Sequence, residues 1–323
     1  MTPRARVIVT RRLPEPVERQ LAAEFDVRLN ATDVPSSPAS LAEALREADG
    51  VVCTITDTLD AAVLATAPRR ARILANFGVG HGHIDLGAAR AAGVVVTNTP
   101  GVLTDDTADL TMTLLLATAR RAGEGERMVR SGTWSGWRPT QLLGTRVTGK
   151  SLGIVGYGRI GRAVAARARL GFRMTVMTFD PMLPPAGEAS PGVRQCASLE
   201  ELLAASDFVS LHCPATPDTR HLIGAPQLAR LRPHAILVNT ARGDVIDEAA
   251  LVDALGRQQL AAVGLDVYEH EPAVSPGLLA TDRVVLLPHV GSATIETRTA
   301  MGMCVLANLR AFFAGHAPPD RVA

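Results

Sequence analysis

The chain has 323 residues, with 33 Lys and Arg side chains against 32 Asp and Glu, and a formal net charge of +1. This length is enough for two domains of ordinary size. The balanced charge, without a basic run that contains aromatic residues, argues against nucleic acid as a partner. The longest apolar stretch, residues 110–119, is too short to cross a bilayer, and the N-terminus lacks a signal-peptide core. We therefore expect a cytoplasmic protein with no membrane partner.

The cysteines and histidines give no indication of a metal site. The cysteines have no CxxC spacing, so we interpret them as reduced thiols packed like small apolar residues: Cys53, Cys196, Cys213 and Cys304. His81 and His83 form a close pair, but nothing nearby supplies further ligands, so no metal is predicted.

The first hundred residues alternate β-branched runs with segments rich in Ala, Leu and Glu. We predict strands at residues 6–10, 50–54, 72–77 and 94–99, and helices at 16–25, 40–48, 61–68 and 84–93. Strands that alternate with helices of about ten residues indicate a parallel sheet covered on both faces.

The pattern changes after the Pro-Gly pair at residues 100 and 101. An apolar helix within residues 102–122 is too long for a routine crossover, and we interpret it as the spine joining two domains. Residues 131–150 are less regular and hold both tryptophans, Trp134 and Trp137. Strand and helix alternation then resumes, with strands in 150–155, 174–179, 208–214, 235–243, 261–272 and 284–290.

A final helix, within residues 292–315, is expected to return the chain to the first domain. The predicted fold is α/β, with two doubly wound parallel-sheet domains. Residues 102–290 form a Rossmann nucleotide-binding domain, and residues 1–101 with 291–323 form a discontinuous, flavodoxin-like substrate domain.

The stretch "GIVGYGRIG" contains a GxGxxG turn between a predicted buried strand and an amphipathic helix. In this context Gly156 permits the tight turn, Gly158 lets backbone amides approach a pyrophosphate, and Gly161 allows close packing of helix on strand. The next strand ends in Asp180, whose carboxylate can accept the hydroxyls of an adenosine ribose. The sequence therefore predicts a dinucleotide of the NAD type at the helix N-terminus.

Three polar side chains at the ends of later strands suit the reduction of a 2-keto acid. Arg242 can hold a substrate carboxylate with two hydrogen bonds and polarise the adjacent carbonyl. His289 can give a proton to the carbonyl oxygen, and Glu271 can orient the imidazole and favour its charged form. In the first domain, the glycine-rich stretch "NFGVGHGHID" offers the bare amides of Val79 and Gly80 to the same carboxylate.

These motifs resemble those of the D-isomer-specific 2-hydroxyacid dehydrogenases, and among them most closely the glyoxylate/hydroxypyruvate reductases. The motifs on which the resemblance rests are, in order from residue 76 to residue 294, "NFGVG", "GIVGYGRIG", "LVNTARGDVIDEAAL", "GLDVYEHEP" and "LLPHVGSAT". The resemblance implies the catalytic trio Arg242, Glu271 and His289, with Ser292 close to the substrate. Further cofactor contacts that it implies are Thr107, Arg159, Ile160, Pro214, Thr219, Thr240 and Asp266.

The resemblance also implies a homodimer joined through the nucleotide domains, in which Trp134 or Trp137 reaches the partner's active site; Trp137 is taken as the substrate contact. Two departures from the family pattern stand out. Gly82 occupies a position where the family commonly has Asp or Asn. Moreover, no basic residue follows "FDPM", where many glyoxylate reductases carry an Arg for the NADPH phosphate. NAD(H) is therefore the expected cofactor, with NADP(H) as the alternative.

Glyoxylate and hydroxypyruvate are the expected substrates, and larger 2-keto acids stay open. Glu271 argues against formate oxidation, which needs no proton relay. Residues 51–68 contain no Lys or Arg to bind a phosphorylated substrate, which disfavours a D-3-phosphoglycerate dehydrogenase. A non-enzymatic NADH-sensing protein is the rival from another class, because such members of this superfamily keep the same trio.

Overall fold

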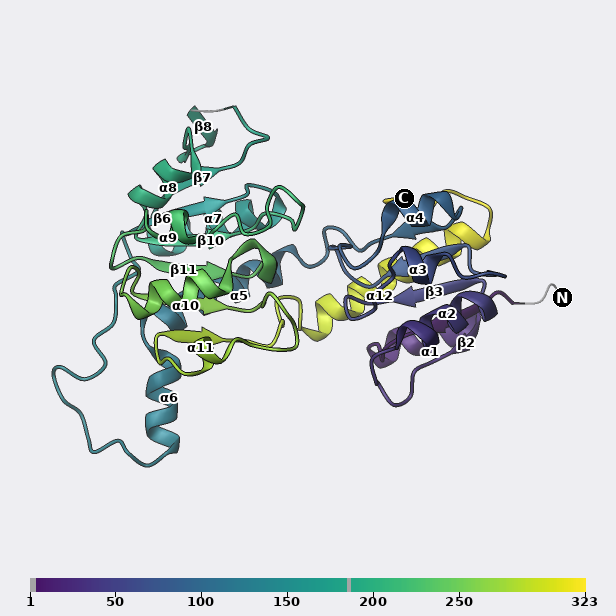
Figure 1. Cartoon of the computed structure of the whole chain (residues 1–323), viewed down its shortest axis with the longest axis horizontal. Coiled ribbons are helices and arrows are strands. Elements are labelled where there is room, and N and C mark those ends of the chain that lie inside the picture. Colours follow the sequence, from purple (N-terminus) through teal and green to yellow (C-terminus); the bar gives the residue numbers. More distant parts are fainter. Residues whose placement is uncertain (1–3, 185–186) are drawn as a thin grey trace. The chain divides into compact units, whose positions relative to one another are not determined.

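A computed structural model describes residues 4–184 and 187–323, and it divides the chain into two compact units. Unit 1 consists of Met1–Leu103 with Ser292–Ala323, and unit 2 of Thr104–Gly291. The crossings thus fall after Leu103 and Gly291, where the sequence analysis expected them after residues 101 and 290. Figure 1 shows the elements of both units, which we describe separately.

Unit 1 is built on a five-stranded parallel sheet of order β2-β1-β3-β4-β5, the flavodoxin-like order. Its strands are β1 (Arg6–Val9), β2 (Asp26–Arg28), β3 (Gly50–Cys53), β4 (Ile73–Asn76) and β5 (Val95–Thr97). Its helices are α1 (Glu15–Glu24), α2 (Pro38–Glu47), α3 (Ala61–Leu64), α4 (Leu86–Ala91) and α12 (Ile295–Phe313). Two apolar clusters cover the two faces of the sheet, one with α2, α3 and α4 and the other with α1 and α12.

Short polar side chains begin the helices of unit 1. Ser37, Asp60, Asp85 and Thr294 each precede a helix, and each side chain accepts the backbone N–H three residues on. Such caps satisfy amides that have no partner within the helix, which fixes where α2, α3, α4 and α12 start.

Unit 2 is built on an eight-stranded sheet of order β13-β12-β11-β10-β6-β7-β9-β8. Its strands are β6 (Ser151–Val155), β7 (Thr175–Phe179), β8 (Gly187–Ser190), β9 (Val193–Gln195), β10 (Phe208–Leu211), β11 (Ile236–Asn239), β12 (Ala262–Leu265) and β13 (Val284–Leu286). All neighbours are parallel except β8 and β9. The order reverses between β6 and β10, and at such a point an open α/β sheet binds its ligand.

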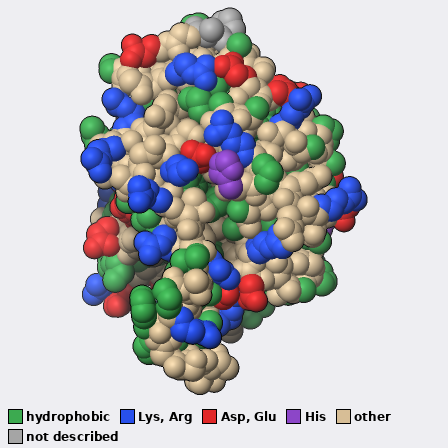
Figure 2. Space-filling view, turned by 90° about the vertical axis from the view of Figure 1, so that its left-hand side faces the viewer, with side chains coloured by type: hydrophobic (Ala, Val, Ile, Leu, Met, Phe, Trp, Pro, Cys, Tyr) green, Lys and Arg blue, Asp and Glu red, His purple; other side chains and the backbone are tan. Residues whose placement is uncertain are grey.

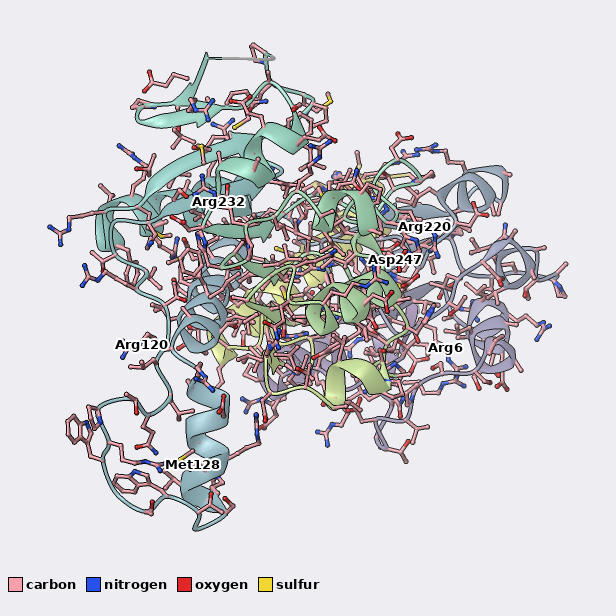
Figure 3. All side chains as sticks on the ribbon, turned by 60° about the vertical axis from the view of Figure 1, so that its left-hand side comes forward. Arg6, Arg120, Met128, Arg220, Arg232 and Asp247 are labelled. Atoms are coloured by element: carbon pink, nitrogen blue, oxygen red, sulfur yellow. The ribbon has the colours of Figure 1, made fainter. Side chains whose placement is uncertain are left out.

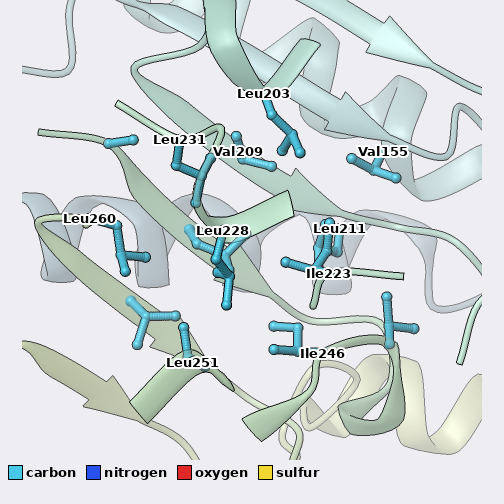
Figure 4. Close-up of a cluster of buried hydrophobic side chains, with 14 of the residues drawn as sticks. Val155, Leu203, Val209, Leu211, Ile223, Leu228, Leu231, Ile246, Leu251 and Leu260 are labelled. Carbon is cyan, nitrogen blue, oxygen red and sulfur yellow. The ribbon is translucent and has the colours of Figure 1, made fainter. Parts of the chain in front are cut away.

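Helices cover both faces of this sheet and bury two apolar clusters. They are α5 (Thr104–Ala119), α6 (Ala122–Arg130), α7 (Arg159–Phe172), α8 (Leu199–Ala205), α9 (Ala225–Leu228), α10 (Glu248–Gly256) and α11 (Pro276–Leu279), with the 3₁₀ turn η1 (Gly243–Val245). Figure 4 shows the cluster in which Leu211 and Val209 of β10 pack with Leu228 and Leu251 of the covering helices. The spine helix α5 packs closely on β12, because a Cβ at Gly264 would lie 2.7 Å from Leu114.

The α/β fold class with two parallel-sheet domains is confirmed, and four elements were missed. β2 is a three-residue edge strand, β8 with β9 forms an antiparallel edge hairpin, and α6 has no buried residue. β2, β8 and β9 have only three or four residues each, too few to show an apolar period, and α6 is short and has few apolar side chains. The helix predicted at 61–68 is also shorter, since α3 spans only Ala61–Leu64.

The four cysteines are free thiols, three of them buried, as the sequence analysis expected. On the face drawn in Figure 2, basic and acidic side chains are interspersed without a continuous field of one sign. Within residues 4–184 and 187–323, no helix combines the length and the apolar character needed to span a bilayer.

Candidate active site

The glycine turn joins β6 to α7 with the geometry that the three glycines predict. Gly156 has φ +90°, and a Cβ there would lie 2.7 Å from the Cys213 amide. A Cβ on Gly161 would lie 2.3 Å from the Gly156 carbonyl oxygen, so only glycine lets α7 approach the turn. A Cβ on Gly158, by contrast, would meet no atom of the described residues within 4 Å. The turn is therefore closed on the protein side and open where a pyrophosphate would approach the N-terminus of α7, at Arg159 and Ile160.

Asp180 follows β7 and is fixed against the glycine turn. Its Oδ2 accepts from the Tyr157 amide at 2.8 Å, and its Oδ1 accepts from the Met182 amide at 2.9 Å. Each oxygen of a carboxylate can accept two hydrogen bonds, so each keeps capacity for a ligand hydroxyl. The position and the remaining capacity fit the ribose contact expected of this residue.

Arg242 follows β11 in a braced turn. Asn239, at the end of the strand, accepts from the Ala241 amide at 2.9 Å and donates to the Arg242 carbonyl at 2.8 Å. Gly243 packs so tightly that a Cβ would lie 1.9 Å from the Tyr268 carbonyl. Burial lowers the pKa of Arg242, an effect that the charges of Glu271 and Asp244 oppose. The guanidinium itself donates from Nη1 to the Ala241 carbonyl at 2.6 Å, which restricts the direction of its fork.

Glu271 and His289 form a hydrogen-bonded pair at the ends of β12 and β13. The Nδ1 of His289 donates to Oε2 of Glu271 at 2.7 Å, while Oε1 of Glu271 accepts from the Tyr268 amide at 3.0 Å. His289 has φ +54°, and its amide donates to the Asp266 carbonyl at 2.8 Å. Burial raises the pKa of Glu271, but the hydrogen bond and charge of His289 outweigh it and leave that pKa lowered. The carboxylate therefore stays ionised and directs Nε2 of the imidazole outward.

Asp266 and two threonines line the same edge of the sheet. Asp266 is buried, and its two oxygens accept from the amides of Val290 and Gly291 at 2.8 and 2.9 Å. Burial raises the pKa of this carboxyl although the two amides and His289 counteract it. A Cβ at Gly291 would lie 3.3 Å from Asp266 and 3.6 Å from Thr107, so these two predicted residues are neighbours. Asp266 thus fixes the backbone that follows His289.

Thr107 and Thr240 are linked through Thr111, one turn further along α5. The Thr111 hydroxyl donates to the Thr107 carbonyl at 2.7 Å and lies 2.8 Å from the Thr240 hydroxyl. Because the Thr111 proton is engaged, the Thr240 hydroxyl is the donor of that second bond. Thr219 closes the loop after β10 by donating to the Pro214 carbonyl at 2.6 Å. All five predicted cofactor positions in this part of unit 2 therefore follow β10, β11 or β12, or lie in the first turn of α5.

In unit 1, the loop after β4 has the carbonyls of Gly78, Val79 and Gly80 engaged by protein donors. Asn76 donates to the carbonyls of Gly78 and Gly80 at 3.0 Å each, and Asn98 donates to the Val79 carbonyl at 2.9 Å. Within the described residues, the amides of Val79 and Gly80 donate to no protein acceptor. Backbone amides without a protein acceptor suit an anion, so binding of a carboxylate here stays a prediction.

The remaining predicted residues are Ser292, Trp134 and Trp137. Ser292 opens the second segment of unit 1, and its carbonyl accepts from Arg298 at 3.1 Å. Trp134 and Trp137 follow α6 with exposed fractions of 53% and 81%. In Figure 3, α6, which carries Met128, extends from unit 2 together with the segment that follows it.

Several supporting residues were not predicted. Asn239 braces Arg242, Thr111 links two threonines, and Tyr268 donates both its amide to Glu271 and its hydroxyl to the Leu287 carbonyl at 2.8 Å. Burial raises the pKa of Tyr268 to about 12, so the hydroxyl stays a donor. For Asn239 the sequence did hold a clue, since a polar residue ends an otherwise apolar strand.

Known proteins with this architecture agree with the chemistry of the site. Residues 112–291 match the description "D-isomer specific 2-hydroxyacid dehydrogenase, NAD binding domain". The chain is 46% identical to a glyoxylate reductase of Korarchaeum cryptofilum over 320 residues, covering 98% of this chain and 95% of that protein. A glyoxylate reductase of Thermococcus litoralis is 43% identical over 321 residues, with coverage of 98% and 96%.

Among solved structures, an NADPH-dependent glyoxylate/hydroxypyruvate reductase of Sinorhizobium meliloti in complex with NADP and malonate has a TM-score of 0.87. It is 34% identical, and the match covers 99% of this chain and 97% of that chain. An open dinucleotide turn, with Arg, Glu and His at neighbouring strand ends, defines a nicotinamide-dependent oxidoreductase. The chain belongs to the D-isomer specific 2-hydroxyacid dehydrogenase family.

Proposed function

We propose that this enzyme reduces small 2-keto acids, glyoxylate and hydroxypyruvate, to the D-2-hydroxy acids, with NADH as the preferred reductant. The observation that carries the proposal is the 2.7 Å hydrogen bond between His289 and Glu271, set at strand ends beside Asp266. That bond leaves Nε2 of the imidazole as the ring atom that can give a proton. The names of the relatives described above support the choice of substrate class.

The roles of the residues follow from their contacts. The bound nicotinamide cofactor supplies the hydride. Arg242 binds the substrate carboxylate and polarises the neighbouring carbonyl, with the amides of Val79 and Gly80 as further donors. His289 gives its Nε2 proton to the carbonyl oxygen as negative charge develops there, and Glu271 stabilises the charged imidazole that does so. Ser292 and a tryptophan of the partner subunit complete the substrate contacts.

The cofactor contacts proposed here surround the glycine turn and the adjacent strand ends. Gly156, Gly158 and Gly161 shape the turn, Arg159 and Ile160 begin the helix that faces the pyrophosphate, and Asp180 accepts from the ribose. Around the nicotinamide half we place the following residues: Thr107, Pro214, Thr219, Thr240 and Asp266. The open space at Gly158 supports this assignment, since backbone can approach the pyrophosphate only where no side chain intervenes.

A homodimer is part of the proposal, and the exposed apolar side chains of α6 and the segment after it support it. A cytoplasmic location stays a prediction from the sequence.

A panel of 2-keto acids assayed with NADH and with NADPH tests the proposed function. We expect the highest kcat/KM for glyoxylate or hydroxypyruvate with NADH, and D-glycerate as the product from hydroxypyruvate. NADH binding without turnover of any acid in the panel would contradict the proposal and would favour a nucleotide-sensing protein.

A further inference from the structure

A second polar cluster lies directly behind the Glu271–His289 pair. Glu269 precedes Glu271 by two residues, and its side chain is only 11% exposed. Its Oε1 accepts from Nε2 of His221 at 2.7 Å and from Nη2 of Arg220 at 3.2 Å. Its own amide donates to Oε1 of Glu248 at 2.7 Å. None of these four side chains has a role in the proposed reaction.

The cluster joins three segments that carry proposed functional residues. His221 belongs to the segment after β10 that contains Thr219, and its amide donates to the Asp244 carbonyl at 2.8 Å. Asp244 lies in η1, two residues after Arg242, and Glu248 begins α10 just beyond it. Glu269 therefore ties the loop of Glu271 to the turn of Arg242 and to the segment of Thr219. Arg220, one of its partners, is labelled in Figure 3.

The loop that carries Glu271 depends on this attachment. Residues 270–273 are exposed, and the Ala273 amide donates only to the His270 carbonyl within the same loop. Glu271 itself is oriented by the Tyr268 amide, whose position is fixed next to Glu269. A displacement of residues 268–269 would thus move the carboxylate that orients His289. Misplacement of a reacting group by about 1 Å can cost about a hundredfold in rate.

The charges in the cluster are arranged to keep Glu269 ionised. Arg220 and His221 face its carboxylate from the segment after β10, His270 follows it in the chain, and Glu248 is the neighbouring acid. Burial raises the pKa of Glu269, but the hydrogen bond and charge of His221 outweigh it, so that the pKa is lowered. Hydrogen bonds to a charged group are about twice as strong as those between neutral groups.

We infer that Glu269 is a positioning residue for the reaction: through His221, Arg220 and Glu248 it holds the loop on which Glu271 orients His289. The inference rests on the proposed roles of Glu271 and His289. It assigns to Glu269 no contact with substrate or cofactor.

Glu269→Gln tests this inference because it keeps the shape of the side chain and removes its charge. With glyoxylate and NADH, kcat should fall about tenfold or more, while KM for glyoxylate and Kd for NADH stay within about twofold. Glu201→Gln is the matched control. Glu201 also pairs with an arginine, Arg194, and accepts from a backbone amide, that of Ala197, but it lies at the start of α8. The control should retain the parent kcat.

Glu269→Gln in a Glu271→Gln background separates an effect on the position of Glu271 from an effect on the general stability of the fold. If Glu269 acts through Glu271, kcat should fall by less than about twofold further, because the relay is already impaired. The loss in Tm should be the same in both backgrounds. An equal loss of kcat in both backgrounds would overturn the inference. So would weaker NADH binding at unchanged kcat, which would assign the cluster to the cofactor segment.

His221→Asn is the second variant, for the case that Glu269→Gln does not fold. His221 has φ +52°, a conformation that Asn adopts more readily than most residues, but the Asn side chain is too short to reach Glu269. We expect a smaller fall in kcat in the same direction, since Arg220 remains. If the parent reduces no keto acid, the proposed function fails. If the parent is active and both variants keep its kcat, only the present inference fails.

Discussion

The hydrogen bond between Glu271 and Nδ1 of His289 places a negative charge beside the imidazole that gives its Nε2 proton to the substrate. The pKa of Glu271 is lowered, so this charge is present throughout the neutral range. In Glu271→Gln the charge is gone and the imidazole holds its proton less firmly. The fall of kcat/KM at high pH should therefore move to lower pH. The measurement is kcat/KM for glyoxylate across the neutral range.

His289→Ala provides the companion measurement for this pair. It should lower kcat by about 10²–10⁴-fold, the usual contribution of a general acid, while fluorescence titration shows unchanged NADH binding. A pH profile that does not move in Glu271→Gln would count against the pairing in the reacting enzyme.

Asp180 is the side chain that should select the cofactor. The amides of Tyr157 and Met182 hold its carboxylate in place, so it cannot turn away from a 2′-phosphate. No Arg or Lys follows in the sequence before Arg194, which is paired with Glu201, and Arg162 is stacked on the ring of Tyr157. A phosphate with about −1.5 to −2 charge would meet like charge there, at a cost of about 1–4 kcal/mol per unit charge at about 4 Å.

We therefore expect kcat/KM with NADH to exceed that with NADPH by about tenfold or more, equivalent to about 1.4 kcal/mol. Asp180→Ser should narrow the preference. Since an NADPH-dependent reductase is among the related structures, membership of the family does not decide this question. Equal values of kcat/KM with NADH and NADPH would indicate that the exposed Arg159 neutralises the charge of the 2′-phosphate.

The placement of Arg242, Glu271 and His289 along one edge of the sheet was predictable because each residue follows a strand, and parallel strands bring their carboxyl ends to one edge. The supporting residues were not. Glu269 and His221 are 48 residues apart in the chain, and only the pairing of β10, β11 and β12 brings their segments together. Nothing in the local sequence distinguishes a glutamate that forms such a buried hydrogen bond from a glutamate that faces solvent.

Two glycines of the turn at the start of α7, Gly158 and Gly161, allow the approach of the cofactor and the packing of the helix to be tested separately. A Cβ at Gly158 would meet no atom of the described residues within 4 Å, whereas at Gly161 it would lie 2.3 Å from the Gly156 carbonyl. Gly158→Ala should therefore keep the parent Tm and weaken NADH binding. Gly161→Ala should lower Tm and weaken binding together, because α7 must move away from the turn.

Gly171→Ala, in the same helix, is the control for these variants. Its Cβ also meets nothing within 4 Å, and Ala is the better helix former by about 0.8–1.0 kcal/mol, so Tm should rise slightly at unchanged NADH affinity. Full NADH affinity in Gly158→Ala would mean that the pyrophosphate does not approach at that position.

The opposite ends of the strands are held by Asp207, just before β10. Its Oδ2 accepts from the amide and the hydroxyl of Ser151, at the start of β6, and its Oδ1 accepts from His234 at 2.9 Å. Burial raises the pKa of this carboxyl, but these bonds and Lys150 outweigh it and bring the pKa from 3.8 to about 2. A carboxyl whose pKa is lower in the folded state stabilises the fold above the unfolded-state value and loses that contribution as pH falls.

Asp207→Asn should therefore lower the free energy of unfolding by about 2 kcal/mol at neutral pH, from nearly two pKa units at about 1.36 kcal/mol each. The difference between parent and variant should shrink as pH falls from about 4 toward about 2. Urea unfolding at several pH values measures it. Asp253→Asn, which removes a surface pair with Arg257, should leave stability unchanged. A difference independent of pH would show that the charge of Asp207 is not its source.

Strands with a strong apolar pattern were predicted along the whole chain, whereas α6 was not predicted. The reason is that α6 is short, has few apolar side chains and buries none of its residues within its own chain. An element of this kind in a folded protein needs an explanation outside the chain that contains it, and a second copy supplies one.

The exposed apolar side chains of the arm, defined as α6 with residues 131–150, lead to a prediction about the assembled enzyme. Val129, Trp134, Trp137 and Leu143 are 53–81% exposed, and tryptophan is among the residues that contribute most at interfaces. We expect light scattering to give twice the mass of one chain, and Val129→Asp to reduce that mass and the activity together. A monomer that is fully active at nanomolar concentration would contradict the proposed dimer.

Trp134→Ala and Trp137→Ala form a matched pair that asks which ring reaches the substrate of the partner subunit. Trp137 is the more exposed of the two, at 81% against 53%, so it has the more surface left to bury against a second chain. Trp137→Ala should raise KM for hydroxypyruvate by about tenfold, about 1.4 kcal/mol, with kcat and dimer mass unchanged. Trp134→Ala should leave KM within about twofold. The reverse pattern would assign the contact to Trp134, and parent KM values in both dimeric variants would show that the arm supports assembly without contributing to the site.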